Sequence, residues 1–579
     1  MRQISAGIRW REIDLSHYAP ALSSTIVGLV GTASKGPLNE RRYIGSVEQL
    51  VQVYGYPDED YPALYAALQY LREGNQLWFI RVESAANPAT RAEVSVNGID
   101  SVAQLWKARD FGTFYNGAIL KVTHAAPMNT TDSAEADGTE DTFAYTLTAP
   151  VVPGTVTLKA GATLLASDNG EGAITGTGIT GTVNYLTGAV AITFTAAPAA
   201  ATHTLAGQHY STFNVEVFKV IENKSFAIET FRNLGLNNLQ ENYYATVLAS
   251  SVVVEAPADL EVFPQVGSYV LAGGDDGLAG LNDADYIGMN LGTVSTGLQA
   301  FADPEAVDVN VVAVPGISSG AVVQALVALA ESRQDCMVLP DPPRNLSVES
   351  VVDWINGSGA YASQNAINSS YAAVYYPWVK IPDSYNRKEV WAAPSGFALA
   401  AFARSELHYA PAGGARGKVL GSTGVERILN EGQRVLLYNN RVNPISDFVA
   451  SGILIWGQKT TQVESSDLDR VVARRVLLAV EKVVVTGLRP LVFEPNNRYT
   501  WNRARSIVQP FLDGMVAKGA LIYGKVVCDE NTNTPEVVAR NEMVVNVFLK
   551  LPKTAEIITV NFVLLATAAN VEEYLGRQF

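Results

Sequence analysis

Residues 541–567 read NEMVVNVFLKLPKTAEIITVNFVLLAT, and more of the architecture follows from this stretch than from any other. A period of two is typical of β-strands, whose successive side chains point to opposite faces. The stretch therefore predicts two strands, with a connection near residues 552–555, where Pro552 interrupts the pattern. The alternating apolar positions are Met543, Val545, Val547, Leu549 and Leu551 in the first strand and Ile558, Val560, Phe562 and Leu564 in the second.

The residues just before this stretch predict a helix that covers it. Apolar side chains recur at helical spacing between Ala504 and Val516, which gives a stripe that can pack on a sheet. Pro510 lies inside the stripe, and because proline has no N–H to donate, we expect a kink or a break there. Residues 520–527 (ALIYGKVV) predict another strand. This unit contains no recognisable chemistry, which favours a scaffold over a catalyst.

The composition is that of an ordered, acidic, multidomain protein. Its 579 residues exceed what one hydrophobic core holds, so about three or four domains are expected. Hydrophobic residues make up 48% and charged residues 17%, as in globular chains. The net charge of −15 argues against direct binding of nucleic acid, which needs a basic surface. It also argues against direct contact with an anionic membrane.

The chain shows no sign of secretion or membrane insertion. Residues 1–10 (MRQISAGIRW) lack the apolar core of a signal peptide. No apolar run approaches the roughly 18 residues of a membrane span. We therefore expect a protein that is made in the cytoplasm. Cys336 and Cys528 are far apart in sequence, and we expect two buried free thiols rather than a disulfide or a metal site.

Residues 1–20 predict an extended N-terminal arm. Ile4, Ile8, Trp10 and Ile13 are spaced too loosely for a helix, and glycine and proline punctuate the segment. Such an apolar segment needs a surface to pack on. It is either an edge strand of its own domain or a strand lent to a neighbouring subunit.

Strands and helices alternate in residues 21–84 and again in 261–495, which indicates a mixed α/β fold with a largely parallel sheet covered on both sides. Ser46 is an expected N-cap, and Pro394 is expected to interrupt a helix early. The predicted strands are 26–31, 78–82, 309–314, 337–339, 372–376 and 453–456, and the predicted helices are 46–50, 62–72, 319–332, 347–356, 390–406 and 468–485.

Residues 85–260 differ in composition and predict an insertion on the outer surface. Between 129 and 210, Gly, Thr and Ala dominate, and short alternating runs are separated by glycine turns. This spacing predicts a small antiparallel β-domain, most simply a sandwich. A disordered linker is the alternative, but the alternation of Val183, Tyr185, Ile192 and Phe194 argues against it.

Arg470, Arg474 and Arg475 lie on the early turns of the helix predicted over 468–485. A solvated helix face is the simple interpretation of three such arginines. An interface with an acidic neighbouring subunit is the alternative.

Motifs that would carry catalysis, a cofactor or a metal fail when each is tested. Residues 176–181 match the spacing of a dinucleotide-binding loop, but no helix follows to receive a phosphate. Residues 413–418 resemble a phosphate-binding loop, but Ala412 and Val419 replace its required glycine and hydroxyl. Acidic residues 275–285 lack the spacing of a calcium loop. No Gly-x-Ser-x-Gly elbow occurs, so we expect no enzyme and no catalytic, cofactor-binding or metal residues.

Four passages carry a resemblance to a known family. They are residues 7–15 (GIRWREIDL) with 27–37 (VGLVGTASKGP), residues 46–55 (SVEQLVQVYG), residues 271–277 (LAGGDDG) with 284–288 (ADYIG), and residues 496–501 (NNRYTW) with the strands after them. In their order and spacing they resemble the tail sheath proteins of contractile-tailed bacteriophages. The resemblance covers the chain apart from most of the insertion.

This resemblance implies a structural role. Sheath subunits stack as a helical homo-oligomer around an inner tail tube, and the sheath contracts on a trigger from the baseplate to drive the tube through the host envelope. It implies the baseplate, the tube and a tail terminator as partners and the virion tail, assembled in the host cytoplasm, as the location. N- and C-terminal extensions add strands to sheets of neighbouring subunits, for which the candidates here are Ile4, Ile8, Trp10, Ile13, Val545, Val547, Ile558, Val560 and Phe562.

The resemblance divides the chain into an arm at 1–20, an α/β segment at 21–84, the insertion at 85–260, a central domain at 261–495 and a C-terminal domain at 496–579.

A sheath from a non-viral contractile machine, such as a phage-tail-like bacteriocin, is the alternative function. A secreted or surface enzyme or adhesin that binds sugar through the β-insertion is a third hypothesis, and it predicts a monomer.

Overall fold

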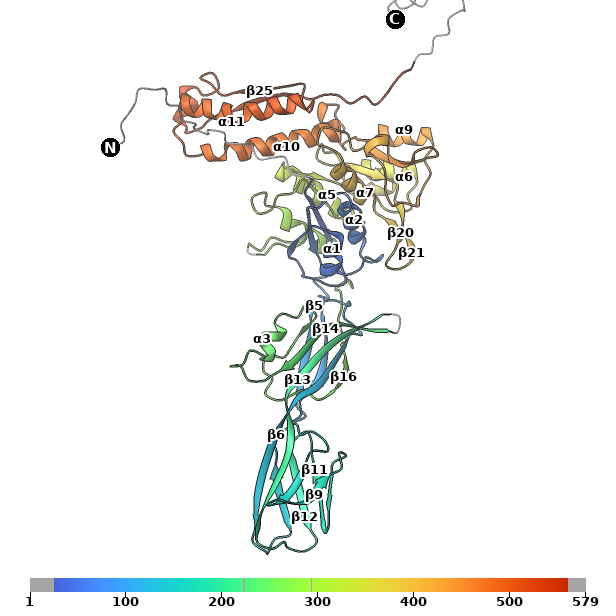
Figure 1. Ribbon diagram of the computed structural model, residues 1–579. Helices are drawn as coiled ribbons and strands as arrows, with labels where there is room; N and C mark the ends of the chain where they lie inside the picture. The colour runs from blue at the N-terminus through green and yellow to red at the C-terminus, as the bar shows by residue number, and fades with distance from the viewer. Residues whose placement is uncertain (1–24, 222–223, 293, 561–579) are drawn as a thin grey trace, which may run out of the picture.

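The computed structural model describes residues 25–221, 224–292 and 294–560. A helical layer that carries the C-terminal hairpin, an α/β centre and a long β-rich arm follow one another in an elongated molecule (Figure 1). The mixed α/β multidomain class with an inserted antiparallel β part is thereby confirmed.

A five-stranded sheet in the order β18-β17-β1-β3-β2 forms the α/β centre. Its neighbours are parallel, except that β2 runs antiparallel to β3. The expected pieces 21–84 and 261–495 therefore share one sheet, and no structural boundary separates them. The strands are β1 (Val27–Gly31), β2 (Arg41–Ile44), β3 (Leu77–Arg81), β17 (Val311–Ala313) and β18 (Met337–Val338).

Helices cover both faces of this sheet. Val27 and Leu29 enter the core that α1, α2 and α7 close, whereas Val30 enters the core that α5 and α6 close. Helix α2 approaches β1 so closely that a Cβ at Gly31 would lie 2.1 Å from the Ala63 Cβ, a distance that only glycine avoids. The helices of the centre are α1 (Val47–Tyr54), α2 (Pro62–Leu71), α4 (Asp283–Ile287), α5 (Gly320–Arg333), α6 (Val348–Asn356), α7 (Pro394–Arg404), α8 (Gly413–Arg416) and α9 (Glu431–Asn439).

Two helix starts test the sequence-based expectations. Ser46 caps α1, because its side chain accepts from the Gln49 N–H at 3.2 Å, as predicted. The helix predicted over 390–406 is wrong at its start. Lys388–Ala392 forms strand β21, and Pro394 is the first residue of α7 rather than an interruption. Proline is well placed there, since the first N–H of a helix has no partner to lose.

Smaller sheets extend the centre toward α9. In one of them β19 pairs with β23 in parallel and β24 pairs with β23 antiparallel. In the other β20 lies between β21 and β22. Their bounds are β19 (Val374–Tyr376), β20 (Val379–Asp383), β21 (Lys388–Ala392), β22 (Gly424–Val425), β23 (Val442–Phe448) and β24 (Gly452–Ile455).

The insertion is built around two long strands, β6 (Ile119–Ala136) and β13 (Ala201–Ile221), in a ten-stranded sheet. The positions 129 and 210 expected to bound a small β-domain lie inside these strands, because the pair runs unbroken through two successive cores. The core nearer the centre is closed by β4 (Arg91–Asn97), β5 (Ala103–Phe111), β14 (Lys224–Leu234), β15 (Val254–Glu255), β16 (Gly267–Val270) and α3 (Tyr244–Leu248).

The distal core holds the alternating residues that the sequence singled out. Val183, Ile192 and Phe194 are buried in it, and Tyr185 packs against it. The alternative of a disordered linker is therefore wrong. The strands that enclose it are β7 (Thr142–Thr146), β8 (Thr157–Ala160), β9 (Thr163–Asp168), β10 (Ala173–Gly176), β11 (Ile179–Val183) and β12 (Ala189–Phe194).

A buried polar joint connects the insertion to the centre. Arg81 on β3 donates to the Phe111 carbonyl at 2.7 Å and lies 3.9 Å from the Asp276 carboxylate. Asp276 also accepts from Tyr61 Oη at 2.5 Å and from the Thr113 N–H at 2.6 Å. A buried charge needs such partners, so the passage LAGGDDG holds the root of the insertion in place.

Asp341 offers a test of how buried polar groups hold the centre together. Its carboxylate accepts from the Ser395 N–H and Oγ at 2.8 and 2.6 Å and from the Gly316 N–H at 3.2 Å. Complete burial raises its pKa from 3.8 to about 6, although these hydrogen bonds oppose the rise. The folded protein thus keeps the proton to a higher pH than the unfolded chain. The stabilisation is present below pH 3.8 and is lost as the pH rises through 6.

We predict that wild type loses about 2 kcal/mol relative to Asp341→Asn between pH 4 and pH 7, since one pKa unit corresponds to about 1.4 kcal/mol. Apparent Tm measured at several pH values checks this. Asp383→Asn is the control, because the effect of pH on stability is expected to have the opposite sign there. Burial raises the pKa of Asp383, but hydrogen bonds from Tyr65 and Asn386 hold it below its usual value. A pH-independent difference for Asp341→Asn would contradict the prediction.

Candidate assembly surface at the C-terminal hairpin

Two long helices, α10 (Val471–Leu488) and α11 (Arg498–Ala517), form the floor of the C-terminal layer. The expected break at Pro510 is wrong, because α11 runs through this residue. Pro510 lies on the exposed side of the helix, away from its buried face. Asn497 caps α11 by accepting from the N–H groups of Tyr499 and Thr500.

A hairpin of β25 (Tyr523–Val527) and β26 (Asn546–Lys550) covers these helices, and the loop between the strands contains α12 (Pro535–Ala539). Gly524 lies opposite Leu549, and Val526 opposite Val547. The sequence-based strands at 520–527 and 543–551 thus form, although shorter than expected. In Figure 1 the chain leaves β26 and runs away from the hairpin toward the C-terminus.

The hydrophobic core under the hairpin is closed on one side only. Val526 on β25 and Leu512 on α11 are buried in it. The apolar side chains of β26 and its flanks belong to the same cluster but are only partly buried. They are Met543, Val545, Val547, Leu549 and Leu551. The β26 side of this layer therefore leaves apolar surface and a strand edge uncovered in the single chain.

Beyond β26 a polar clamp holds the chain against the central domain. Arg470 donates to both carboxylate oxygens of Glu556, at 2.6 and 3.0 Å. Gln458 donates to Thr554 Oγ1 at 2.5 Å and to Glu556 at 3.1 Å. Burial would raise the pKa of Glu556, but Arg470 together with Tyr438 and Gln458 holds it below its usual value. The carboxylate is therefore ionised and paired at neutral pH.

The segment after the clamp is exposed and unpaired. Ile558 and Val560 are 80% and 64% exposed, and residues 551–560 form no strand within the described chain. The second predicted strand is therefore absent as far as residue 560. The candidate strand residues outside the described residues are Phe562, Ile4, Ile8, Trp10 and Ile13.

The three arginines of α10 do not share one role. Arg470 is bound within the subunit by Glu556, as described above. Arg474 and Arg475 are only 4% and 7% exposed, so a solvated face is wrong for both, and neither side chain is open to an acidic neighbour. The Arg474 guanidinium lies 3.5 Å from the centre of the Tyr371 ring. Helical spacing alone did not reveal that this face of α10 packs on the centre.

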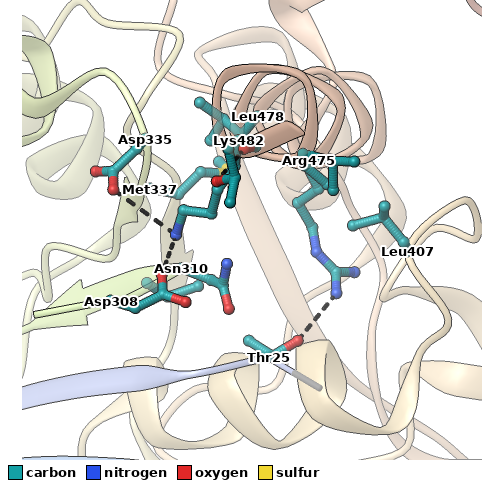
Figure 2. Close-up of a pocket in the computed structure, with 13 residues that line it drawn as sticks. Thr25, Asp308, Asn310, Asp335, Met337, Leu407, Arg475, Leu478 and Lys482 are labelled. Atoms are coloured by element: carbon teal, nitrogen blue, oxygen red, sulfur yellow. Dashed lines mark hydrogen bonds and ion pairs between the residues drawn. The ribbon is translucent and has the colours of Figure 1, made fainter. Parts of the chain in front are cut away.

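A cavity of about 240 Å³ shows how α10 is joined to the central sheet (Figure 2). Arg475 donates to the Phe402 carbonyl at 2.9 Å and to Thr25 Oγ1 at 3.4 Å. Lys482 donates to Asp308 and lies 3.7 Å from Asp335. Burial lowers the pKa of Arg475 to about 10, so it stays charged at neutral pH. Both Arg475 and Lys482 therefore have partners in the centre, and these polar contacts across the cavity join α10 to the centre.

The described residues hold no group of three or more His, Cys, Asp and Glu side chains arranged to bind a metal ion. Cys336 and Cys528 are free and buried, as predicted. In the part of the chain that the structure describes, no helix is long and apolar enough to cross a membrane.

Sequence reasoning missed the clamp. A signal was present, because Glu556 is the only acidic residue between positions 543 and 571. An isolated carboxylate in an alternating apolar stretch indicates a fixed cationic partner. Its partner Arg470 was identified as a candidate for an interface, but not for this contact.

Comparisons with known families and structures identify two matched domains in this chain. Residues 283–461 match the phage tail sheath protein central domain, and residues 463–564 match the phage tail sheath C-terminal domain. The second match covers the α10–α11 layer and its hairpin. The chain therefore carries two domains of phage tail sheath proteins, which confirms the resemblance drawn from the sequence.

Particular relatives agree with this assignment. The chain is 31% identical over 295 residues to the tail sheath protein of Enterobacteria phage T4, covering 48% of this chain and 45% of that protein. It is 28% identical over 376 residues to the tail sheath protein of Vibrio phage KVP40, covering 61% of this chain and 52% of the relative. The chain thus spans about half the length of these relatives.

A solved structure supports the fold. The sheath tail protein from Desulfitobacterium hafniense superposes with a TM-score of 0.55 at 13% identity, covering 91% of this chain and 94% of that one. At this identity the similarity shows the fold alone.

The clamp yields a prediction about the C-terminal segment. Glu556→Gln removes a partly exposed ion pair worth about 1 kcal/mol, so the 551–556 segment opens about fivefold more often. Trypsin cleavage after Lys553, followed by mass spectrometry, measures this opening. The charge exchange Arg470→Glu with Glu556→Arg restores protection. Equal cleavage of wild type and Glu556→Gln would show that the clamp does not hold the segment.

Proposed function

We propose that this chain is the structural subunit of a contractile tail sheath. It polymerises as a helical tube around an inner tail tube and contracts to drive that tube through a host envelope. The observation that carries the proposal is one surface within the matched C-terminal domain, where an open strand edge on β26 and an unpaired alternating segment at 557–560 occur in the same chain. Such a subunit extends one copy at a time without closing.

The mechanism follows from the same elements. Copies joined by added strands are held by backbone hydrogen bonds, which survive rotation of the packed domains on either side. The centre and the helical layer turn as rigid bodies, and the extended segments between subunits act as hinges. Energy stored in subunit contacts drives the change, so the proposal requires no catalytic residue, nucleotide, cofactor or metal.

The proposed partners are further copies of this chain, the inner tail tube protein, the baseplate and a tail terminator, with no direct contact to nucleic acid or membrane. The proposed location is the virion tail, assembled in the host cytoplasm. The same subunit in a non-viral contractile machine is the second candidate. It differs in the genes beside it, since capsid and terminase genes indicate a phage.

We predict that deletion of residues 1–16 leaves the subunit folded but abolishes tube formation, because the arm then contributes strands between subunits and not core. Negative-stain electron microscopy of the purified protein, with circular dichroism as the control for folding, tests this. Tubes of normal length from the truncated chain would contradict exchange of the N-terminal strand.

We also predict that the distal unit of the insertion is dispensable for assembly, because it lies at the far end of the molecule from the helical layer (Figure 1). Ala136 lies opposite Ala201, so an Asn-Gly turn in place of residues 137–200 joins β6 to β13 as a hairpin. Tube formation by this variant is expected to equal that of wild type. A soluble variant that forms no tubes would assign the distal unit to assembly.

A further inference from the structure

The side-chain amide of Gln509, on α11, pairs with the backbone of β25. Its Oε1 accepts from the Val526 N–H at 2.9 Å, and its Nε2 donates to the Gly524 carbonyl at 3.1 Å. Nε2 also donates to Asp513 one turn further along the helix, at 2.8 Å, which steadies the amide. A neighbouring parallel strand would engage this same carbonyl and N–H, two residues apart. Gln509 therefore occupies the place of a strand beside β25.

This contact shows which edge of the hairpin remains open. The N–H of Val526 points toward Gln509 and so away from β26, which makes Val526 and Val547 a pair that exchanges no hydrogen bonds. The same holds for Gly524 and Leu549, two residues along. Val547 and Leu549 thus direct their own N–H and carbonyl groups away from β25. The free edge of the hairpin is the outer edge of β26.

The uncovered apolar surface lies on the same side. Val547 and Leu549 are partly buried in the cluster that also contains the partly buried Val484 and Leu488 of α10. A hairpin covers about 10 Å of width at a strand spacing of 4.7–4.9 Å, whereas two packed helices span about twice that. A strand added beside β26 would cover the remaining apolar floor. A strand beside β25 would have to displace Gln509.

We propose that Gln509 is a positioning residue that closes the β25 edge, so that the C-terminal segment of a second copy adds only beside β26. This inference rests on the proposed function and assigns the edge at which copies join. The segment around Ile558 and Val560 is the occupant, because it is exposed and alternating. Its own hairpin is out of reach, since the Arg470–Glu556 clamp directs the segment away from β26.

Disulfide formation between two full-length copies tests the assignment, because a disulfide needs Cα atoms within about 7 Å and so reports only adjacent strands. One copy carries Phe548→Cys on β26 or Lys525→Cys on β25. The other carries a single cysteine at one of the positions 557–564, which together cover the registers of the predicted second strand. The native thiols, Cys336 and Cys528, are buried. Oxidation is performed on assembled tubes.

We expect linked dimers from Phe548→Cys and none from Lys525→Cys. Gln509→Leu, which keeps the bulk but removes the amide, is expected to give the Lys525→Cys copy a new cross-link. Ser506→Ala is the matched control and should change nothing, because the Ser506 hydroxyl donates to the Asn502 carbonyl of its own helix. Equal cross-linking of both strands with Gln509 present would overturn the proposal. So would a Gln509→Leu protein that forms tubes and gains no link at β25.

Two further outcomes are distinguishable. Tubes with no link at either strand would overturn strand addition itself, and with it the proposed mode of assembly. A link from Phe548→Cys to Ile8→Cys in place of the C-terminal positions would overturn the choice of occupant.

Hydrogen exchange supplies a readout that does not depend on whether the Gln509→Leu variant folds. In wild type, the Val547 and Leu549 amides should gain protection on assembly, whereas the Val526 amide should be protected before it.

Discussion

The backbone groups on the outer edge of β26 must find partners, and much of the C-terminal architecture is arranged around this requirement. A two-stranded hairpin is marginally stable alone, and an exposed strand edge invites pairing with another chain. Here α11 supports one face of the hairpin and Gln509 caps one edge. The remaining edge is flanked by half-buried apolar side chains. A monomer leaves these groups to water, whereas the proposed assembly would pair them and complete the core.

The hairpin is coupled to the rest of the subunit through α10. Val471 and Leu478 of this helix lie in the core of the centre, and Val476 and Val480 lie in the core under the hairpin. The paired cations on the same helix add polar contacts to the central sheet (Figure 2). A displacement of the strand partners is therefore transmitted to the centre, because densely packed cores move as units rather than deform. The buried Arg81–Asp276 joint couples the insertion to the centre in the same way.

The parts of the fold that sequence patterns predicted are those that local rules determine. The period of two near Val547 gave a strand, the Ser46 cap gave a helix start, and the alternation around Ile192 gave the distal β-core. The errors concern tertiary context. Pro510 is tolerated because it faces solvent, and Pro394 begins a helix because the chain turns there from a strand. Arg474 and Arg475 read as surface residues, although the face of α10 that carries them packs on the centre.

The candidate surface was predicted only in part, for a physical reason. Alternation at Ile558 and Val560 predicts a strand, but a strand forms only beside a partner edge, and within the described part of the chain this segment pairs with none. The clamp at Glu556 and the cap at Gln509 depend on side chains that meet from distant positions, which no local pattern reveals. The sequence did indicate that the alternating apolar segment around Ile558 and Val560 needs a strand partner outside its own core.

The most direct measurement is a helical reconstruction of assembled tubes by cryo-electron microscopy at a resolution that separates strands. We expect continuous strand density on the outer edge of β26, contributed by another subunit, with the Gln509 amide still on β25. Tubes whose subunits meet through other surfaces, with the β26 edge facing solvent, would contradict it.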